Sequence, residues 1–233
     1  MSIFKFKQFE VDQSNCAMKI NTDGVLLAAL AESESPKRIL DIGTGTGVLA
    51  LMMAQRFPIA KIEAVEIDEL ASATAGRNFQ SSVFYERLTI SNVAIEHYST
   101  TEKFDLIISN PPFFVNDLKN TEEKKGIARH ASDRFFKDLI TKVDEILNSD
   151  GSFWFILPVK QAELLIENAK KLKLYPSKII QLHSDISKPV FRFIVSLSRN
   201  NQYILEEHFY IYEAEKTYTN AYKELLKAFF LGY

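Results

Sequence analysis

The sequence predicts an α/β protein built on a doubly wound, mostly parallel, seven-stranded sheet with helices on both faces. Three observations favour this fold. From residue 38 onward, short β-branched runs alternate with segments of helical periodicity. A glycine-rich turn follows the first run, and a proline pair follows the fourth. Alternation of this kind is typical of parallel strands that are covered on both sides by their connecting helices.

Each predicted strand is a short apolar run that ends at a turn residue. The first ends at Gly43, and the fourth must end before Pro111, because proline cannot donate a hydrogen bond to a sheet ladder. The last two runs alternate like strands, which predicts a hairpin at the edge of the sheet. In chain order, the predicted strands span residues 38–42, 61–66, 88–90, 104–109, 152–157, 177–183 and 190–198.

Segments of helical periodicity lie between these strands. The first of them starts at Val48, and Ser132 suits the N-cap of the third. Ahead of the first strand, Thr22 and Asp23 are expected to cap a helix that opens at Gly24. The helices predicted after the strands span residues 48–56, 69–79, 132–147 and 161–173.

The composition of the 233 residues is ordinary for a globular protein, with 46% hydrophobic and 25% charged residues. We expect one domain, 1–233, in which residues 1–35 form an N-terminal extension packed near the ligand and substrate site. No stretch is apolar enough for a transmembrane helix, the start does not resemble a signal peptide, and Cys16 is the single cysteine. These features predict a monomeric cytoplasmic protein without a metal centre or a membrane partner. The net charge of −2 argues against tight non-specific binding of nucleic acid but leaves room for a local basic patch.

Residues after the first two strands predict a nucleoside site at the carboxyl edge of the sheet, where ligands of doubly wound sheets bind. Gly43, Gly45 and Gly47 let the backbone turn tightly and approach a ligand. Free N–H groups at the start of the following helix face the same place. Glu66 ends the second strand, where a carboxylate can accept hydrogen bonds from both ribose hydroxyls. Asp68 competes for that role, but it also suits the N-cap of the next helix.

The segment Asn110-Pro111-Pro112-Phe113, after the fourth strand, points to chemistry on a planar NH2 group. The lone pair of such a nitrogen is delocalised, and two acceptors aimed at its hydrogens favour a pyramidal, nucleophilic nitrogen. The Asn110 side-chain oxygen and the Pro111 carbonyl supply these acceptors, and the proline pair stiffens the loop that holds them. Phe113 offers a face on which a flat base can stack. A structural turn after a strand is the alternative interpretation of the proline pair.

The glycine spacing departs from a dinucleotide-binding fingerprint, because the third glycine comes one position early and Val48 fills the place of a small residue. With Asp41 ahead of it, the turn resembles motif I of the class I methyltransferases, which have a Rossmann-like fold. This resemblance implies S-adenosylmethionine as the cofactor, with Asp41 offering negative charge towards its ammonium group, directly or through water. Asn92 stands where that family contacts the cofactor's adenine ring, or is a turn residue. The cofactor-binding residues predicted from this motif and its neighbours are Asp41, Gly43, Thr44, Gly45, Gly47, Glu66, Ile67, Asn92, Thr22 and Asp23.

The segment Asn110-Pro111-Pro112-Phe113 resembles the (Asp or Asn)-Pro-Pro-aromatic signature of methyltransferases that act on adenine N6, cytosine N4, guanine N2 or glutamine N5. Together with residues 6–9, 16–27, 128–130 and 218–231, it is similar to the bacterial tRNA1(Val) adenine-N6 methyltransferase family over essentially the whole chain. That family methylates adenine 37, beside the anticodon of one valine tRNA. The resemblance therefore implies the anticodon stem-loop of a tRNA as the partner.

The residues are compatible with such a substrate, because an unpaired anticodon-loop base costs little to turn into a pocket. Segment 113–137 combines cations with aromatic side chains, which predicts either a surface that grips RNA or a solvated mobile loop. His130 suits a contact with an RNA phosphate better than the role of a general base. Methyl transfer to the amine needs no base, because the amine proton becomes acidic once the methyl group has transferred. The predicted catalytic residues are Asn110, Pro111, Pro112 and Phe113, and the predicted substrate-binding residues are Phe113, Phe114, Lys19, Arg129 and His130.

Three other functions fit parts of the pattern. A guanine-N2 RNA methyltransferase shares the Asn-Pro-Pro-Phe signature. A protein glutamine-N5 methyltransferase shares it too, but usually carries a helical substrate domain ahead of motif I, and only about forty residues precede the motif here. A non-catalytic RNA-binding module would keep Gly43, Gly45 and Glu66 and lose the acceptor pair, whereas Asn110 and Pro111 are present.

Overall fold

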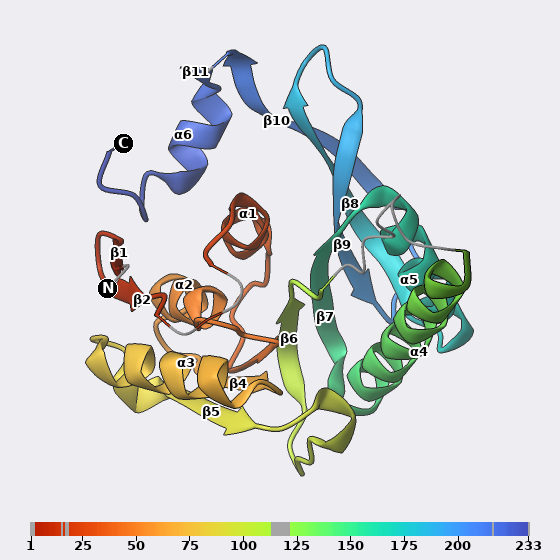
Figure 1. Cartoon of the computed structure of the whole chain (residues 1–233), viewed down its shortest axis with the longest axis horizontal. Helices are drawn as coiled ribbons and strands as arrows, with labels where there is room; N and C mark the ends of the chain where they lie inside the picture. The colour runs from red at the N-terminus through yellow and green to blue at the C-terminus, as the bar shows by residue number, and fades with distance from the viewer. Residues whose placement is uncertain (1–2, 15, 17–18, 113–121, 216, 233) are drawn as a thin grey trace.

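The computed structural model describes residues 3–14, 16, 19–112, 122–215 and 217–232, with only the backbone described between 122 and 132. Figure 1 shows a strongly curved sheet with helices on both sides. The strands are β1 (Ile3–Lys5), β2 (Glu10–Asp12), β3 (Arg38–Ile42), β4 (Lys61–Glu66), β5 (Leu88–Asn92), β6 (Phe104–Ser109), β7 (Leu147–Leu157), β8 (Tyr175–Asp185), β9 (Val190–Ser198), β10 (Leu205–Ala214) and β11 (Thr217–Tyr218). The helices are α1 (Thr22–Leu30), α2 (Val48–Arg56), α3 (Glu69–Ser81), α4 (Glu122–Ile146), α5 (Val159–Lys171) and α6 (Asn220–Leu226), with short 3-10 helices η1 (Tyr85–Arg87) and η2 (Ile95–His97).

The large sheet confirms the predicted α/β fold. Its strands follow the order β11-β10-β8-β9-β7-β6-β3-β4-β5. From β7 to β5 all neighbours are parallel, whereas β9 runs antiparallel between β7 and β8. The chain moves from β3 to β4 on one side and later returns to β6 on the other. This switch point beside β3 is where doubly wound sheets bind their ligands.

Two details of the predicted sheet are wrong. The β8–β9 hairpin lies inside the sheet and not at its edge, because β10 pairs with β8 in parallel and β11 follows it. The sheet has nine strands instead of seven. Within β10, Glu206 and Glu207 are adjacent and Ile211 is the one buried residue of the strand. Its sequence therefore lacks the apolar alternation by which a strand is predicted.

Helix α4 also differs from the prediction at its start. It begins at Glu122, so Ser132 lies inside the helix and is not its N-cap. The residues from 122 to 132 are mostly charged or small, and apolar periodicity sets in only after them. From there the helix buries one face, made of Phe136, Leu139, Ile140 and Val143.

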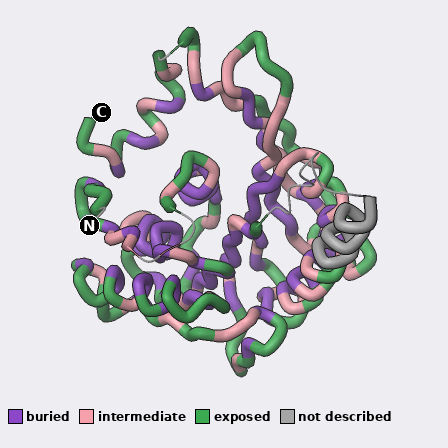
Figure 2. The backbone as a smooth tube through the Cα atoms, viewed as in Figure 1, coloured by how far each residue is buried: buried purple, intermediate pink, exposed green. Residues whose placement is uncertain are grey.

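Each face of the sheet has its own hydrophobic core. Helices α1, α2 and α3 cover one face, and α4 and α5 cover the other (Figure 1). Tyr222 and Leu226 of α6 join the first cluster, whereas Phe136 of α4 and Leu165 of α5 belong to the second. Figure 2 shows that the buried backbone runs through the sheet and the helix sides that face it. No helix in the described ranges is long and apolar enough to cross a membrane.

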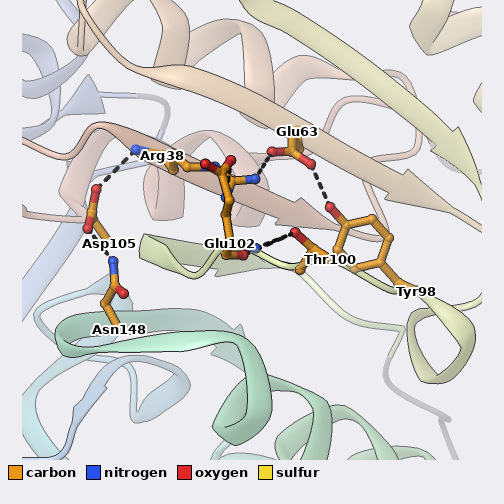
Figure 3. A network of polar contacts seen from close by, with 7 residues as sticks. All are labelled: Arg38, Glu63, Tyr98, Thr100, Glu102, Asp105 and Asn148. Carbon is orange, nitrogen blue, oxygen red and sulfur yellow. Dashed lines mark hydrogen bonds and ion pairs between the residues drawn. The ribbon is translucent and has the colours of Figure 1, made fainter.

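A polar network fastens the amino edge of the sheet, opposite the predicted site (Figure 3). Asp105 Oδ2 accepts the backbone N–H of Arg38 at 3.0 Å, and Asp105 Oδ1 accepts the Asn148 amide at 2.6 Å. The Arg38 guanidinium forms ion pairs with Glu63 and Glu102. These contacts join the starts of β3 and β6. The network therefore stabilises the sheet at the edge opposite the carboxyl ends, where the site lies.

Candidate active site

The glycine-rich turn between β3 and α2 has the backbone that its sequence predicts. Gly43, Gly45 and Gly47 have φ values of +71°, +57° and +85°, a region that residues with a Cβ rarely adopt. At Gly47 the space is closed as well, because a Cβ there would lie 2.5 Å from Cε1 of Phe79. The turn therefore holds its backbone at the carboxyl edge of the sheet, directly ahead of the free N–H groups of α2.

Asp41 braces this turn from inside. Its side chain is fully buried, and Oδ2 accepts hydrogen bonds from Thr44 Oγ1 at 2.5 Å and from the backbone N–H of Ala50 at 3.2 Å. Oδ1 is buried without a hydrogen-bond partner among the described residues. Burial raises the pKa of this carboxyl to about 7, against the lowering effect of the Thr44 and Ala50 hydrogen bonds. A buried acceptor without a partner is costly, which suits a site completed by a water or by a donor group of a ligand.

The raised pKa of Asp41 predicts a pH-dependent stability for the protein without cofactor. Because the folded-state pKa exceeds the ordinary value of 3.8, the folded chain binds more protons than the unfolded chain between about pH 4 and pH 7. The free energy of unfolding contributed by this group therefore falls as the pH rises through that window.

We expect Asp41→Asn to remove this fall, so its melting temperature relative to the parent protein should rise between about pH 5 and pH 8. Thermal unfolding at the two pH values measures the difference; Asp150→Asn, at an exposed position of β7, should show none. An equal offset of Asp41→Asn at both pH values would contradict the assignment.

Glu66 stands at the end of β4 and faces the same turn. Its Oε2 accepts the backbone N–H of Gly45 at 2.8 Å, and its Oε1 accepts the backbone N–H of Asp68 at 3.0 Å. Each carboxylate oxygen has a second lone pair, so two acceptor positions are left for a ligand. The Asp68 side chain accepts from the N–H of Ala71 at 2.8 Å and is the N-cap of α3, as its sequence position indicated.

Asn92 fastens the neighbouring strand end. Its amide donates to the carbonyl oxygens of Glu66 at 2.8 Å and Ile67 at 3.1 Å, so it joins the ends of β4 and β5. Asn92 does not line a described cavity of the site. A cofactor contact by Asn92 stays a prediction. What the structure shows is that Asn92 holds the loop that carries Ile67.

A large cleft lies beyond the carboxyl ends of β3, β4, β5 and β6. It encloses about 1080 Å³ of space, part of it open to solvent. Glu66 and Asn110 supply polar atoms, and most of the remaining wall is apolar. Ile67 lines the cleft with an exposed fraction of 70%, which is unusual for a large apolar side chain. The lining residues are Cys16, Ile42, Gly43, Gly45, Val65, Glu66, Ile67, Asp68, Ala71, Val93, Ala94, Ile95, Glu96, Ser109, Asn110, Pro111, Pro112 and Phe135.

A smaller cavity adjoins the cleft between the glycine turn and the start of α1. It encloses about 370 Å³ of space, part of it open to solvent. Its lining residues are Lys19, Ile20, Asn21, Gly24, Gly43, Thr44, Gly45, Thr46, Val48, Leu49 and Asn110. The two cavities share Gly43, Gly45 and Asn110. The structure therefore brings the predicted acceptor Asn110 to the junction of both spaces, beside the glycine turn.

The first turn of α1 packs against Asn110. A Cβ on Gly24 would lie 3.4 Å from Asn110 Nδ2 and 3.5 Å from Asn21 Oδ1. Asn21 is the N-cap of α1, and its Oδ1 accepts the N–H of Gly24 at 2.8 Å. The prediction that Thr22 and Asp23 cap this helix is wrong, because the chain turns into the helix one residue earlier.

Thr22 and Asp23 do not line either cavity of the site. Thr22 is exposed, and Asp23 Oδ2 pairs with Arg192 Nε of β9 at 2.8 Å. This ion pair fastens the start of α1 to the sheet. Their predicted contacts with the cofactor stay predictions.

Several predicted residues fall outside the described part of the structure. Phe113 and Phe114 are not described, and Arg129 and His130 lie in α4 with their backbone alone described. Pro111 and Pro112 line the cleft as predicted from the motif.

Phe135 is a cleft residue that the sequence did not single out. It reaches the site because α4 packs on η2, and no local pattern distinguishes it from the core residues around it. The buried Asn78 was missed as well. Its Nδ2 donates to the carbonyls of Asp12 and Thr46, at 2.9 and 2.8 Å, and so joins the N-terminal segment to the glycine turn.

Comparison with known proteins identifies relatives over almost the whole chain. Residues 16–173 match the family described as Methyltransferase small domain. A tRNA1(Val) (adenine(37)-N6)-methyltransferase of Pedobacter heparinus is 52% identical over 230 residues, covering 99% of this chain and 98% of that protein. The protein of the same name from Dyadobacter fermentans is 40% identical over 234 residues, covering 99% and 98%. Among solved structures, a predicted O-methyltransferase of Agrobacterium tumefaciens superposes with a TM-score of 0.69. The match covers 89% of this chain and 96% of that one. At 17% sequence identity it shows a likeness of fold alone.

The sheet order, the glycine turn and the carboxylate at the end of β4 define a class I methyltransferase, an enzyme that depends on S-adenosylmethionine. The matches in sequence are specific enough to go further. The chain belongs to the tRNA1(Val) (adenine(37)-N6)-methyltransferase family, as its motifs predicted.

Proposed function

We propose that this enzyme transfers a methyl group from S-adenosylmethionine to the exocyclic N6 of adenine 37 in the anticodon loop of a valine tRNA. The family supports the substrate, since its members carry that activity in their names. The observation that carries the chemistry is the position of Asn110 and Pro111. Both line the cleft that also contains Glu66 and the glycine turn.

The chain's own residues fit the cofactor. Glu66 has free acceptor positions for the two ribose hydroxyls, and Ile67 and Val93 offer apolar surfaces to an adenine ring. The glycine turn leaves no Cβ between the backbone and a ligand, because Gly43 and Gly45 have open space where a Cβ would stand. When bound, S-adenosylmethionine supplies an electrophilic methyl group on a cationic sulfur. Asn110, which lines both cavities where they meet, would hold the substrate amine next to that group.

Asn110 and Pro111 act on the substrate nitrogen. The amide oxygen of Asn110 and the carbonyl oxygen of Pro111 accept the two hydrogens of the adenine NH2 group. Those hydrogen bonds would draw the nitrogen out of conjugation and so free its lone pair for attack. The acceptors stand on a proline-stiffened loop at a strand end, so little reorganisation is needed when the base arrives. The amine proton becomes acidic after transfer, so no strong base is required.

The RNA substrate enters from the same edge of the sheet. The net charge of −2 makes attraction to RNA depend on local cations and stacking surfaces, and not on the overall field of the protein. Phe135 adds an aromatic wall to the cleft beside Pro111 and Pro112. An anticodon-loop base needs no unpairing before it enters such a cleft.

Mass analysis of nucleosides tests the proposal. An unmodified valine tRNA transcript is incubated with the enzyme and S-adenosylmethionine, then digested. We expect N6-methyladenosine from this transcript and none from a transcript with guanine at position 37. Formation of N2-methylguanosine would replace the proposal with guanine chemistry. Absence of any RNA product, with methyl transfer to a glutamine-containing protein, would favour the glutamine-N5 alternative.

A further inference from the structure

The smaller cavity of the site has the electrostatics of an anion-binding pocket. Lys19 is the one charged residue that lines it, and among the described residues no carboxylate stands in its wall. Lys19 is exposed, and no ion pair joins it to an acidic residue of the described chain. A cation in a concave wall without a counterion favours an anionic ligand.

Two helix N-termini face the same cavity. Val48 and Leu49, at the start of α2, line it on one side, and Asn21 and Gly24, at the start of α1, line it on the other. The helix dipoles place partial positive charge at both ends. The first N–H groups of α2 have no partner inside the helix, whereas Asn21 caps the Gly24 N–H of α1. Asp23, in the first turn of α1, is neutralised by its ion pair with Arg192 and so does not oppose that charge.

The cavity is also the natural place for one end of the cofactor. The larger cleft holds Glu66 and the apolar surfaces suited to ribose and adenine, and it meets the smaller cavity at Gly43, Gly45 and Asn110. With the nucleoside in the larger cleft and the sulfur near Asn110, the amino-acid tail extends into the smaller cavity. Its carboxylate is the anionic group of that tail.

We propose that Lys19 binds the α-carboxylate of the methionine moiety of S-adenosylmethionine, and not the RNA. This inference rests on the proposed use of the cofactor and assigns one residue of its site. The start of α2 assists by presenting backbone N–H groups to the same carboxylate, whereas α1, whose Gly24 N–H is capped by Asn21, contributes through its dipole.

Calorimetric titration with two ligands tests the proposal. S-adenosylhomocysteine carries the amino-acid tail, and 5′-methylthioadenosine has the same nucleoside and sulfur without it. In Lys19→Met, we expect the affinity for S-adenosylhomocysteine to fall about tenfold or more, whereas that for 5′-methylthioadenosine stays the same. Lys19→Arg should retain most of the affinity. Lys160→Met serves as the matched control, because Lys160 is an exposed lysine at the start of α5 that lines neither cavity.

Other outcomes overturn the assignment. An equal loss for both ligands in Lys19→Met would mean that the substitution disturbs the nucleoside site. Unchanged binding of S-adenosylhomocysteine with weakened binding of tRNA would assign Lys19 to the RNA, as its sequence position first indicated. Failure of the parent protein itself to bind S-adenosylhomocysteine would instead contradict the proposed function.

Discussion

Asn110→Ala is expected to lower the rate of methyl transfer by about 10²–10³-fold or more, with little change in the affinity for S-adenosylhomocysteine. The Asn110 side chain lies where the two cavities meet, away from the contacts that Glu66 makes with the glycine turn. Its loss removes an acceptor from the reacting nitrogen. A hydrogen bond that strengthens as the nitrogen becomes pyramidal lowers the barrier more than it tightens binding. Single-turnover rates on tRNA and calorimetric dissociation constants measure the two effects separately.

Two variants control this experiment. Asn110→Asp keeps an acceptor at the same place and should retain more activity than the alanine variant, since the family signature admits either residue. Asn148→Ala removes an amide at the opposite edge of the sheet, where it contacts Asp105, and should transfer methyl groups at the parent rate (Figure 3). A rate for Asn110→Ala within tenfold of the parent would refute the acceptor mechanism.

The parts of the site that the sequence predicted are those fixed by local chemistry. Three alternating glycines predict a tight turn, and in the structure all three have the left-handed backbone that such a turn uses. Asp68 has the residue type and place of an N-cap and forms that contact. The paired prolines end β6 as proline must, and they leave Asn110 in the wall of the cleft, where it meets the smaller cavity. In each case a few neighbouring residues determine the result.

The parts that were missed depend on contacts between distant segments. Phe135 lines the cleft because α4 packs on η2. Lys19 was predicted as a substrate-binding residue, and its place in the wall of the smaller cavity depends on the distant glycine turn and the start of α2 that line the same cavity. Strand β10 buries only Ile211 and owes its place to pairing with β8. Periodicity reports which side of an element is buried, and it carries no information on which distant segment covers a site.

Glu66→Gln is expected to weaken the binding of S-adenosylhomocysteine by about 10²-fold or more, because hydrogen bonds to charged groups are each worth roughly 1.5–3 kcal/mol. The Glu66 carboxylate has two roles: it holds the backbone of the glycine turn, and it offers acceptors to a ligand in the cleft. Its oxygens hold the N–H groups of Gly45 and Asp68, and their remaining lone pairs face the cleft. An amide at this position offers a single acceptor oxygen, and its NH2 group meets a backbone donor. Calorimetric titration measures the loss, and Glu69→Gln, at an exposed position outside the cleft, should bind like the parent.

A dideoxy ligand separates the two roles of Glu66. An analogue of S-adenosylhomocysteine without the 2′ and 3′ hydroxyls makes no hydrogen bond to the carboxylate, so it senses only the shape of the turn. If the ribose contact dominates, this analogue binds Glu66→Gln and the parent with similar, weak affinity. If the contact with Gly45 dominates, the substitution weakens both ligands alike, because the turn itself has moved. The first outcome is expected, since the positive φ values of Gly43 and Gly45 and the hydrogen bond from Thr44 to Asp41 hold the turn without Glu66.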